Sequence, residues 1–173
     1  MELTMAIGHL AHYVLTDQLT PLLIKTKPGA RVIIISSAEH YEGSFADGSL
    51  FVERGEFNSI KAFSKTKLAN VMHGIILAKK FKNTSVIPVS LHPGYVLPQV
   101  GFMVPTLFGA FFKTRWEAAQ TVMQAAMAKD LQPGGYYDDC KLLQPNAEAL
   151  NETIVNTFQK ETTTVINKIL KKK

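Results

Sequence analysis

A short run of β-branched residues decides the fold of this chain: Arg31-Val32-Ile33-Ile34-Ile35-Ser36. The run follows Pro28-Gly29, a pair that ends the preceding helical segment. Its apolar residues do not alternate with polar ones, and such a run is typical of a strand buried on both faces of a parallel sheet. Residues 85–91 (SVIPVSL) have the same character and end at His92-Pro93-Gly94. We therefore predict two buried strands, at 31–36 and 85–91.

Segments with helical periodicity lie on either side of these strands. The spacing predicts helices over residues 2–25, 59–82, 114–129 and 146–170, and a polar loop over 38–58. Thr114 followed by Glu117 is a capping-box pattern for the third helix. The turn Pro133-Gly134-Gly135 precedes a third short strand candidate at Tyr136-Tyr137. For the first helix we expect one apolar face made of Leu3, Ile7, Leu10, Val14 and Leu22.

The order helix, strand, helix, strand, helix, strand, helix predicts an α/β fold. We expect a single domain over residues 1–173, built as part of a Rossmann-like doubly wound parallel sheet of about three strands with flanking helices. So thin a sheet leaves the 31–36 strand without a neighbour on one edge. Because an exposed apolar edge is an aggregation template, we expect poor solubility of the isolated chain.

Composition excludes several classes of protein. The chain has 173 residues, 46% hydrophobic and 19% charged, which is an ordinary globular balance. Its net charge of +5 comes without any basic run interleaved with aromatic residues, so no nucleic-acid partner is expected. The cluster Lys171-Lys172-Lys173 is interpreted as a solvated tail. Cys140 is the single cysteine, which excludes a disulfide within the chain and favours a reducing compartment.

Membrane signals are weak in this sequence. The beginning of the chain is typical of an amphipathic helix and not of a signal peptide. The longest apolar stretch, residues 101–112 (GFMVPTLFGAFF), is too short to span a bilayer and contains Pro105. It remains a buried segment, a lid over a substrate pocket or a patch that touches a membrane. We expect an intracellular protein, cytoplasmic or peripheral to a membrane.

Four segments, in order, resemble one protein family. They are residues 9–16 (HLAHYVLT), 33–40 (IIISSAEH), 62–70 (AFSKTKLAN) and 91–96 (LHPGYV), with a weaker match at 134–140 (GGYYDDC). Each resembles a motif of the short-chain dehydrogenase/reductase family, in its retinol dehydrogenase and WW-domain oxidoreductase branch. The matches cover roughly residues 1 to 145 and correspond to the C-terminal portion of that family's domain. The family's glycine-rich phosphate loop after a strand has no counterpart here.

The resemblance implies NAD- or NADP-dependent oxidoreduction of a small lipophilic carbonyl or alcohol, such as a retinoid or steroid. In the family, a tyrosine donates the proton and a lysine four residues later on the same helix face lowers its pKa. Here Lys67 matches the lysine and Ser37 matches the serine that contacts the substrate oxygen. Phe63 occupies the tyrosine position, and Gly8 occupies the position of an asparagine that holds a water beside the lysine.

Cofactor contacts follow from the same resemblance. Lys67, Pro93 and Gly94 match cofactor-binding positions, whereas Pro98 replaces a threonine that contacts the nicotinamide. Because loss of a positioned acid or base costs about 10² to 10⁴ in rate, we expect this chain to be catalytically impaired or inactive. Two alternatives remain. One is an oxidoreductase whose cofactor-binding half comes from a longer product or a partner. The other is a non-catalytic interaction module, with residues 1–25 and 59–82 packing copies of the chain into a homo-oligomer.

Other interpretations of individual residues also remain. Tyr41 is a substitute proton donor, although no lysine follows it at the required spacing. Lys67 is alternatively a helix lysine with a solvated head group, and Ser37 a residue that only ends its strand. His9 and His12 are spaced to share a metal ion, but no third ligand is evident, so we expect no metal site.

Overall fold

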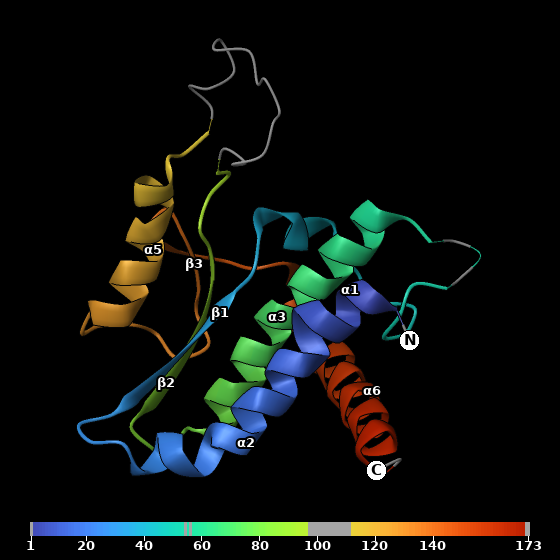
Figure 1. Ribbon diagram of the computed structural model, residues 1–173, viewed down its shortest axis with the longest axis horizontal. Coiled ribbons are helices and arrows are strands. Elements are labelled where there is room, and N and C mark those ends of the chain that lie inside the picture. The colour runs from blue at the N-terminus through green and yellow to red at the C-terminus, as the bar shows by residue number, and fades with distance from the viewer. Residues whose placement is uncertain (1, 54, 56, 97–111, 172–173) are drawn as a thin grey trace.

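A computed structural model of the chain describes residues 2–53, 55, 57–96 and 112–171. It shows a four-stranded sheet in the order β1-β2-β3-β4, with helices on both faces (Figure 1). The strands are β1 (Ala30–Ile35), β2 (Val86–His92), β3 (Tyr136–Asp138) and β4 (Lys141–Leu143). The first three are parallel neighbours, as predicted, and β4 is antiparallel to β3.

The helices begin and end close to the predicted limits. They are α1 (Leu3–Met5), a π-helical turn (Ala6–Leu10), α2 (Ala11–Lys25), α3 (Ser59–Lys80), α5 (Arg115–Met127) and α6 (Glu152–Leu170), with 3₁₀ turns at Ala38–Glu42 and Ala147–Leu150. Asn58 and Asn151 cap α3 and α6 by accepting main-chain N–H groups of the first turn. The predicted capping box of Thr114 and Glu117 at α5 is present.

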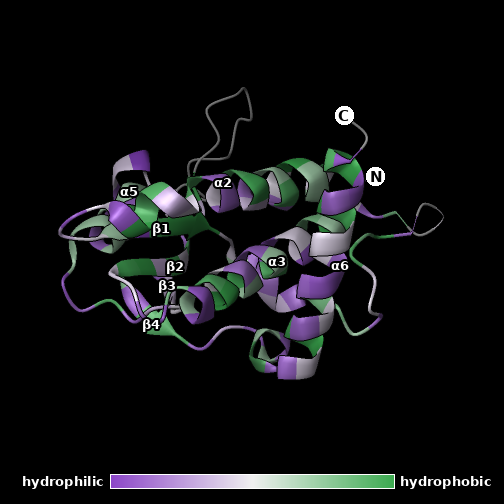
Figure 2. Ribbon diagram, turned by 90° about the horizontal axis from the view of Figure 1, so that it is seen from below, coloured by the Kyte–Doolittle hydropathy of each residue, from purple (hydrophilic) through white to green (hydrophobic). Residues whose placement is uncertain are grey.

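Both faces of the sheet are covered, which explains the continuous apolar runs in its two longest strands. Val32 and Ile34 of β1 pack in one cluster with Leu77 and Phe81 on the side of α2 and α3. Ile33 belongs to another cluster, which includes α5 and β3. Figure 1 shows α5 on one side of the sheet and α2 and α3 on the other, and Figure 2 shows β1 and β2 as strongly hydrophobic.

The predicted apolar face of the first helix is confirmed only in part: Leu10 is buried and Val14 packs against the core. Leu3, Ile7 and Leu22 are 70%, 61% and 64% exposed, whereas Met5 and His9 are buried. The π-helical turn at Ala6–Leu10 contains more residues than an α-helical turn, so the side chains on either side of it do not share one 3.6-residue phase. A periodicity argument assumes that single phase.

Strand β4 was not predicted from the sequence. It follows β3 through the two-residue turn Asp139-Cys140, where both residues have positive φ angles of 46° and 61°. Two left-handed residues in succession are typical of the type I′ hairpin turn, which usually carries Asn-Gly or Asp-Gly. Among the described residues, no helix is both long enough and apolar enough to cross a membrane.

Candidate functional site

The predicted site residues gather where β1 and β2 end. Ser37 follows β1, and Pro93 and Gly94 follow β2. Phe63 and Lys67 are in α3, and Lys67 contacts Ile35 at the end of β1. In open α/β sheets, ligands bind beside the carboxyl ends of parallel strands. The predicted residues therefore lie near the carboxyl ends of β1 and β2, where a ligand can bind.

Phe63 and Lys67 lie one helical turn apart on α3 and contact each other. The Lys67 ammonium lies 5.3 Å from the centre of the Phe63 ring, in a cation–π arrangement. Its Nζ also donates a long hydrogen bond of 3.4 Å to the main-chain oxygen of Ile35. Partial burial lowers the pKa of Lys67, and the carboxylate of Glu39 opposes that shift. Where the family has a phenol beside this lysine, the chain has an aromatic ring with no proton to donate.

The Ser37 hydroxyl is engaged by a carboxylate. It is nearly buried and donates to Glu39 in the 3₁₀ turn that follows β1. Burial acts to raise the pKa of Glu39, but the hydrogen bonds from Ser37, its own main chain and Tyr95 outweigh this effect and lower it. Tyr95, in turn, has a raised pKa because of burial and the nearby Glu39. The sequence did not single out Glu39 or Tyr95 as site residues, because neither matches a catalytic or cofactor-binding position of the family.

Helix α3 approaches Gly8 so closely that no side chain fits there. A Cβ atom at this position would lie 2.7 Å from Cγ2 of Thr66, which is closer than real Cβ contacts allow. Asn70 then uses its side-chain amide to donate to the main-chain oxygens of Gly8 (3.2 Å) and Ile35 (3.1 Å). Its Oδ1 contacts Nδ1 of His9 at 3.1 Å. A side chain at position 8 would therefore require Thr66 to move.

The Pro93-Gly94 turn has a structural requirement of its own. Gly94 has a φ angle of +95°, which L side chains rarely adopt, and a Cβ there would lie 2.5 Å from Cδ of Lys113. Lys113 donates its main-chain N–H to Tyr95 (2.7 Å) and forms an ion pair with Asp139 (2.9 Å). The glycine thus lets the start of the α5 segment pack against the end of β2.

Several alternatives from the sequence are placed elsewhere. The Tyr41 hydroxyl donates to the main-chain oxygen of Gln144 at 2.7 Å, so its proton is already engaged. His9 is buried against Asn70, and no group of three or more metal-binding side chains occurs among the described residues. Pro98 and the apolar stretch 101–112, apart from Phe112, lie outside the described residues.

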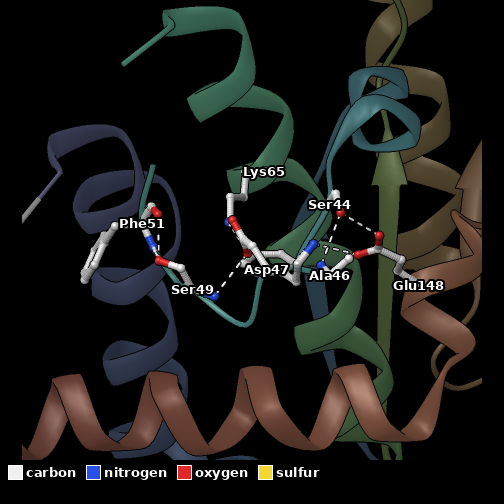
Figure 3. A network of polar contacts seen from close by, with 8 residues as sticks. Ser44, Ala46, Asp47, Ser49, Phe51, Lys65 and Glu148 are labelled. Carbon is white, nitrogen blue, oxygen red and sulfur yellow. Dashed lines mark hydrogen bonds and ion pairs between the residues drawn. The ribbon is translucent and has the colours of Figure 1, made fainter. Parts of the chain in front are cut away.

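A second polar network on α3 was missed by sequence reasoning. Lys65 is only 2% exposed, and its Nζ lies 3.0 Å from both carboxylate oxygens of Asp47 and 5.0 Å from the centre of the Phe45 ring. Figure 3 shows this pair next to Glu148, which accepts hydrogen bonds from the Ser44 hydroxyl and the Phe45 main chain. The network fixes residues 44–51 against α3 and the turn before α6.

No protein-family model matches the sequence, but individual relatives do. Retinol dehydrogenase 12 of Bos taurus is 37% identical over 158 residues, which cover 87% of this chain and 49% of that protein. WW domain-containing oxidoreductase of Gallus gallus is 29% identical over 168 residues, which cover 88% of this chain and 40% of that protein. The chain spans about half the length of the curated relatives it matches.

Solved structures share the fold. An uncharacterized protein from Mycobacterium paratuberculosis matches with a TM-score of 0.70 at 20% identity, over 96% of this chain and 59% of that one. A short chain dehydrogenase from Salmonella enterica (TM-score 0.59, 20% identity, 79% and 51% covered) and NADPH-bound carbonyl reductase from chicken fatty liver (0.58, 18%, 79% and 53%) also match. The sequence relatives and the ordered motifs place the chain in the short-chain dehydrogenase/reductase family, in the branch of the retinol dehydrogenases and WW domain-containing oxidoreductase.

Proposed function

We propose that this chain carries the short-chain dehydrogenase scaffold without an efficient dehydrogenase reaction of its own. The observation that carries the proposal is the Phe63 ring, 5.3 Å from the Lys67 ammonium, where the reaction requires a phenol. Hydride transfer to a carbonyl leaves a negative oxygen that must receive a proton, and a phenylalanine has none to give.

The neighbouring phenols do not replace the missing one. A tyrosine acid at neutral pH needs a lowered pKa, which a cation beside it provides. Tyr95 lies beside a carboxylate instead, and burial and Glu39 raise its pKa. Burial also raises the pKa of Tyr41, and its hydroxyl is held by Gln144. Both groups are therefore poorer acids than an ordinary tyrosine.

Cofactor binding is a separate matter from proton transfer. Members of this family use NAD or NADP, and Lys67, Pro93 and Gly94 occupy the matching positions. Lys67 has no ion pair among the described residues, so its ammonium is available to a ribose hydroxyl or a phosphate. We propose that a nicotinamide dinucleotide would bind at the carboxyl ends of β1 and β2 and that Lys67 would contribute to its affinity.

The test is reduction of all-trans-retinal with NADH or NADPH by the wild-type chain, F63Y and K67M. We expect no measurable turnover for the wild type and a gain of about 10² or more for F63Y, since the new hydroxyl lies one turn from Lys67. Titration calorimetry with NADPH separates binding from chemistry, and we expect K67M to weaken any binding found. Robust turnover by the wild type would overturn the proposal. Wild-type silence that F63Y does not relieve would show that Phe63 is not its cause.

A second candidate function is self-association through the helices at 1–25 and 59–82. Helix α2 exposes Leu15, Leu19 and Leu22, which are four and three residues apart on one side, and Leu3 and Ile7 before it are exposed as well, all at least 40% accessible. Such a stripe on one helix is larger than scattered surface leucines and suits a partner helix. We propose a homo-oligomer through this stripe. Light scattering should show a dimer or larger species that L15E/L22E converts to a monomer, and a wild-type monomer would contradict this proposal.

A further inference from the structure

A cavity opens beside the second half of α3, away from the candidate site at its first half. Its volume is about 420 Å³, within the range of small-molecule sites. The walls come from three helices, and Figure 1 shows α2 and α3 side by side with α6 crossing near them. The lining residues are Tyr13, Asp17, His73, Ile76, Leu77, Lys79, Lys80, Val155, Asn156 and Gln159.

The inner wall of the cavity contains an imidazole without a hydrogen bond. His73 is 2% exposed and stacks on Tyr13, with 4.6 Å between ring centres, but it forms no hydrogen bond with the described residues. Burial lowers the pKa of His73 to about 3, with smaller contributions from His9 and Lys80. At neutral pH the ring is therefore uncharged and offers one N–H donor and one lone-pair acceptor. A buried polar group of this kind normally has a partner.

A second unpaired nitrogen lies directly behind it. The ring centre of His9 is 5.6 Å from that of His73, and His9 is fully buried. Because the Asn70 amide nitrogen already donates to two main-chain oxygens, Asn70 Oδ1 accepts from His9, which places the His9 proton on Nδ1. His9 Nε2 is then an acceptor, and it has no partner. His73 in the cavity wall, and His9 next to it in the core, are therefore polar side chains without charge.

The charged residues at the cavity are already paired. Lys80 forms an ion pair with Asp17 at 2.8 Å, and Lys79 forms one with Glu152 at 3.2 Å. The remaining wall is apolar at Ile76, Leu77 and Val155 and carries neutral amides at Asn156 and Gln159. An ionic ligand would find no unpaired counter-charge here and would lose its hydration, which is costly.

We propose that this cavity binds a neutral aromatic molecule bearing one hydroxyl group, of the phenol or naphthol class, with the hydroxyl bonded to His73. The apolar and aromatic walls accept the ring system, and the ligand hydroxyl donates a hydrogen bond to the lone pair of the neutral imidazole. The Leu15, Leu19 and Leu22 stripe does not compete for this space. Tyr13 and Asp17 are each two residues from Leu15, which places them on nearly the opposite side of α2.

The test uses 2-naphthol as the probe, with naphthalene and 2-naphthoate as neutral and charged comparisons, and follows binding to the full chain by NMR. We expect 2-naphthol to bind at least tenfold more tightly than either comparison and to shift the His73 ring signals. No binding at millimolar 2-naphthol would overturn the proposal. Tighter binding of 2-naphthoate would overturn the assignment to a neutral ligand.

Two variants on exposed positions of α6 locate the site without disturbing the core. Q159W places an indole at the cavity wall, and we expect at least a tenfold loss of 2-naphthol binding. T164W introduces the same group at an exposed position that does not line the cavity and should bind as the wild type does. Equal binding by Q159W and the wild type would place the probe elsewhere and contradict the proposal. H73F should remove the preference for 2-naphthol over naphthalene, and retention of that preference would exclude His73 as the contact.

Discussion

Lys65 and Lys67 are two residues apart on one helix and have opposite environments. Lys65 is buried, paired with both oxygens of Asp47 and placed over the Phe45 ring. Lys67 is partly exposed, has one long hydrogen bond and lies over Phe63. The lysine that matches a catalytic position is thus the loosely held one, and the lysine that matches no catalytic position is the structural one. On α3, the side that carries the family's chemistry is separate from the side that holds the fold.

The same division continues along the helix. His73 is buried and packs against the π-helical turn and α2, where its ring contacts the rings of His9 and Tyr13. Phe63 is 39% exposed at the sheet edge. A change at Lys65 leaves Asp47 without its partner, whereas a change at Phe63 or Lys67 leaves groups that water can reach. The family scaffold can therefore persist while residues of the reactive side change.

Acid should cause the largest effect, and it acts on the buried side. Burial lowers the pKa of His9 to about 4 and of His73 to about 3, from an ordinary value of 6.5. Unfolded chains take up these protons first, so the stability is fully present above pH 6.5 and is lost as the pH falls toward the folded pKa values. We expect a loss of roughly 2 kcal/mol per histidine between pH 7 and pH 5.

Urea unfolding at pH 7, 6 and 5 measures this loss. H73F should remove about half of this pH dependence, because the buried His9 ring remains. A midpoint that is constant between pH 7 and pH 5 would mean that the two rings are not buried as described.

Replacing the two lysines should have an intermediate effect. K65M leaves Asp47 and the loop 44–51 without their anchor, and we expect a loss of about 2 kcal/mol, moderated because Asp47 is half exposed. K67M should cost less than about 0.5 kcal/mol, as is usual for surface substitutions. For a chain of this size the melting temperature should therefore fall by about 4 to 8 °C in K65M and by under about 2 °C in K67M. Equal shifts in the two variants would remove the distinction between the two sides of the helix.

The smallest effect should come from F63Y. The ring is partly exposed, so a hydroxyl at its end can remain hydrated, and we expect a change in unfolding free energy of under about 0.5 kcal/mol. Thermal unfolding beside the wild type measures it. A large loss of unfolding free energy in F63Y would show that the phenylalanine ring is needed for packing.

The fold was predictable where local and global signals agree. Ile33 and Ile34 pack on opposite faces of the sheet, and the unbroken apolar run around them predicted this double burial. Thr114 and Glu117 fixed the start of α5 because a capping box is local chemistry. The β4 strand was missed because Leu142 and Leu143 are exposed and the turn before it uses Asp139-Cys140 in place of glycine.

The site was predictable only as far as its motifs. Ser37 follows β1, Pro93 and Gly94 follow β2, and Lys67 bonds to Ile35 at the end of β1 and contacts Phe63. Their roles toward cofactor and substrate stay predictions. The roles of Lys65 and His73 could not be foreseen, because a helix lysine is normally solvated and a helix histidine carries no spacing signal. Their partners lie 18 residues away at Asp47 and on another helix at Tyr13.

The outer edge of β1 has a consequence for how the chain exchanges hydrogen with water. Ser36 donates its main-chain N–H to Leu91 in β2, so the alternation of the strand turns the N–H groups of Arg31 and Ile33 away from β2. Among the described residues no strand pairs with that edge. In deuterated water these two amides should exchange quickly while their neighbours in the ladder, Val32 and Ile34, stay protected. Protection of all four would report that another strand has joined the sheet, and the two amides thus distinguish an open edge from a covered one.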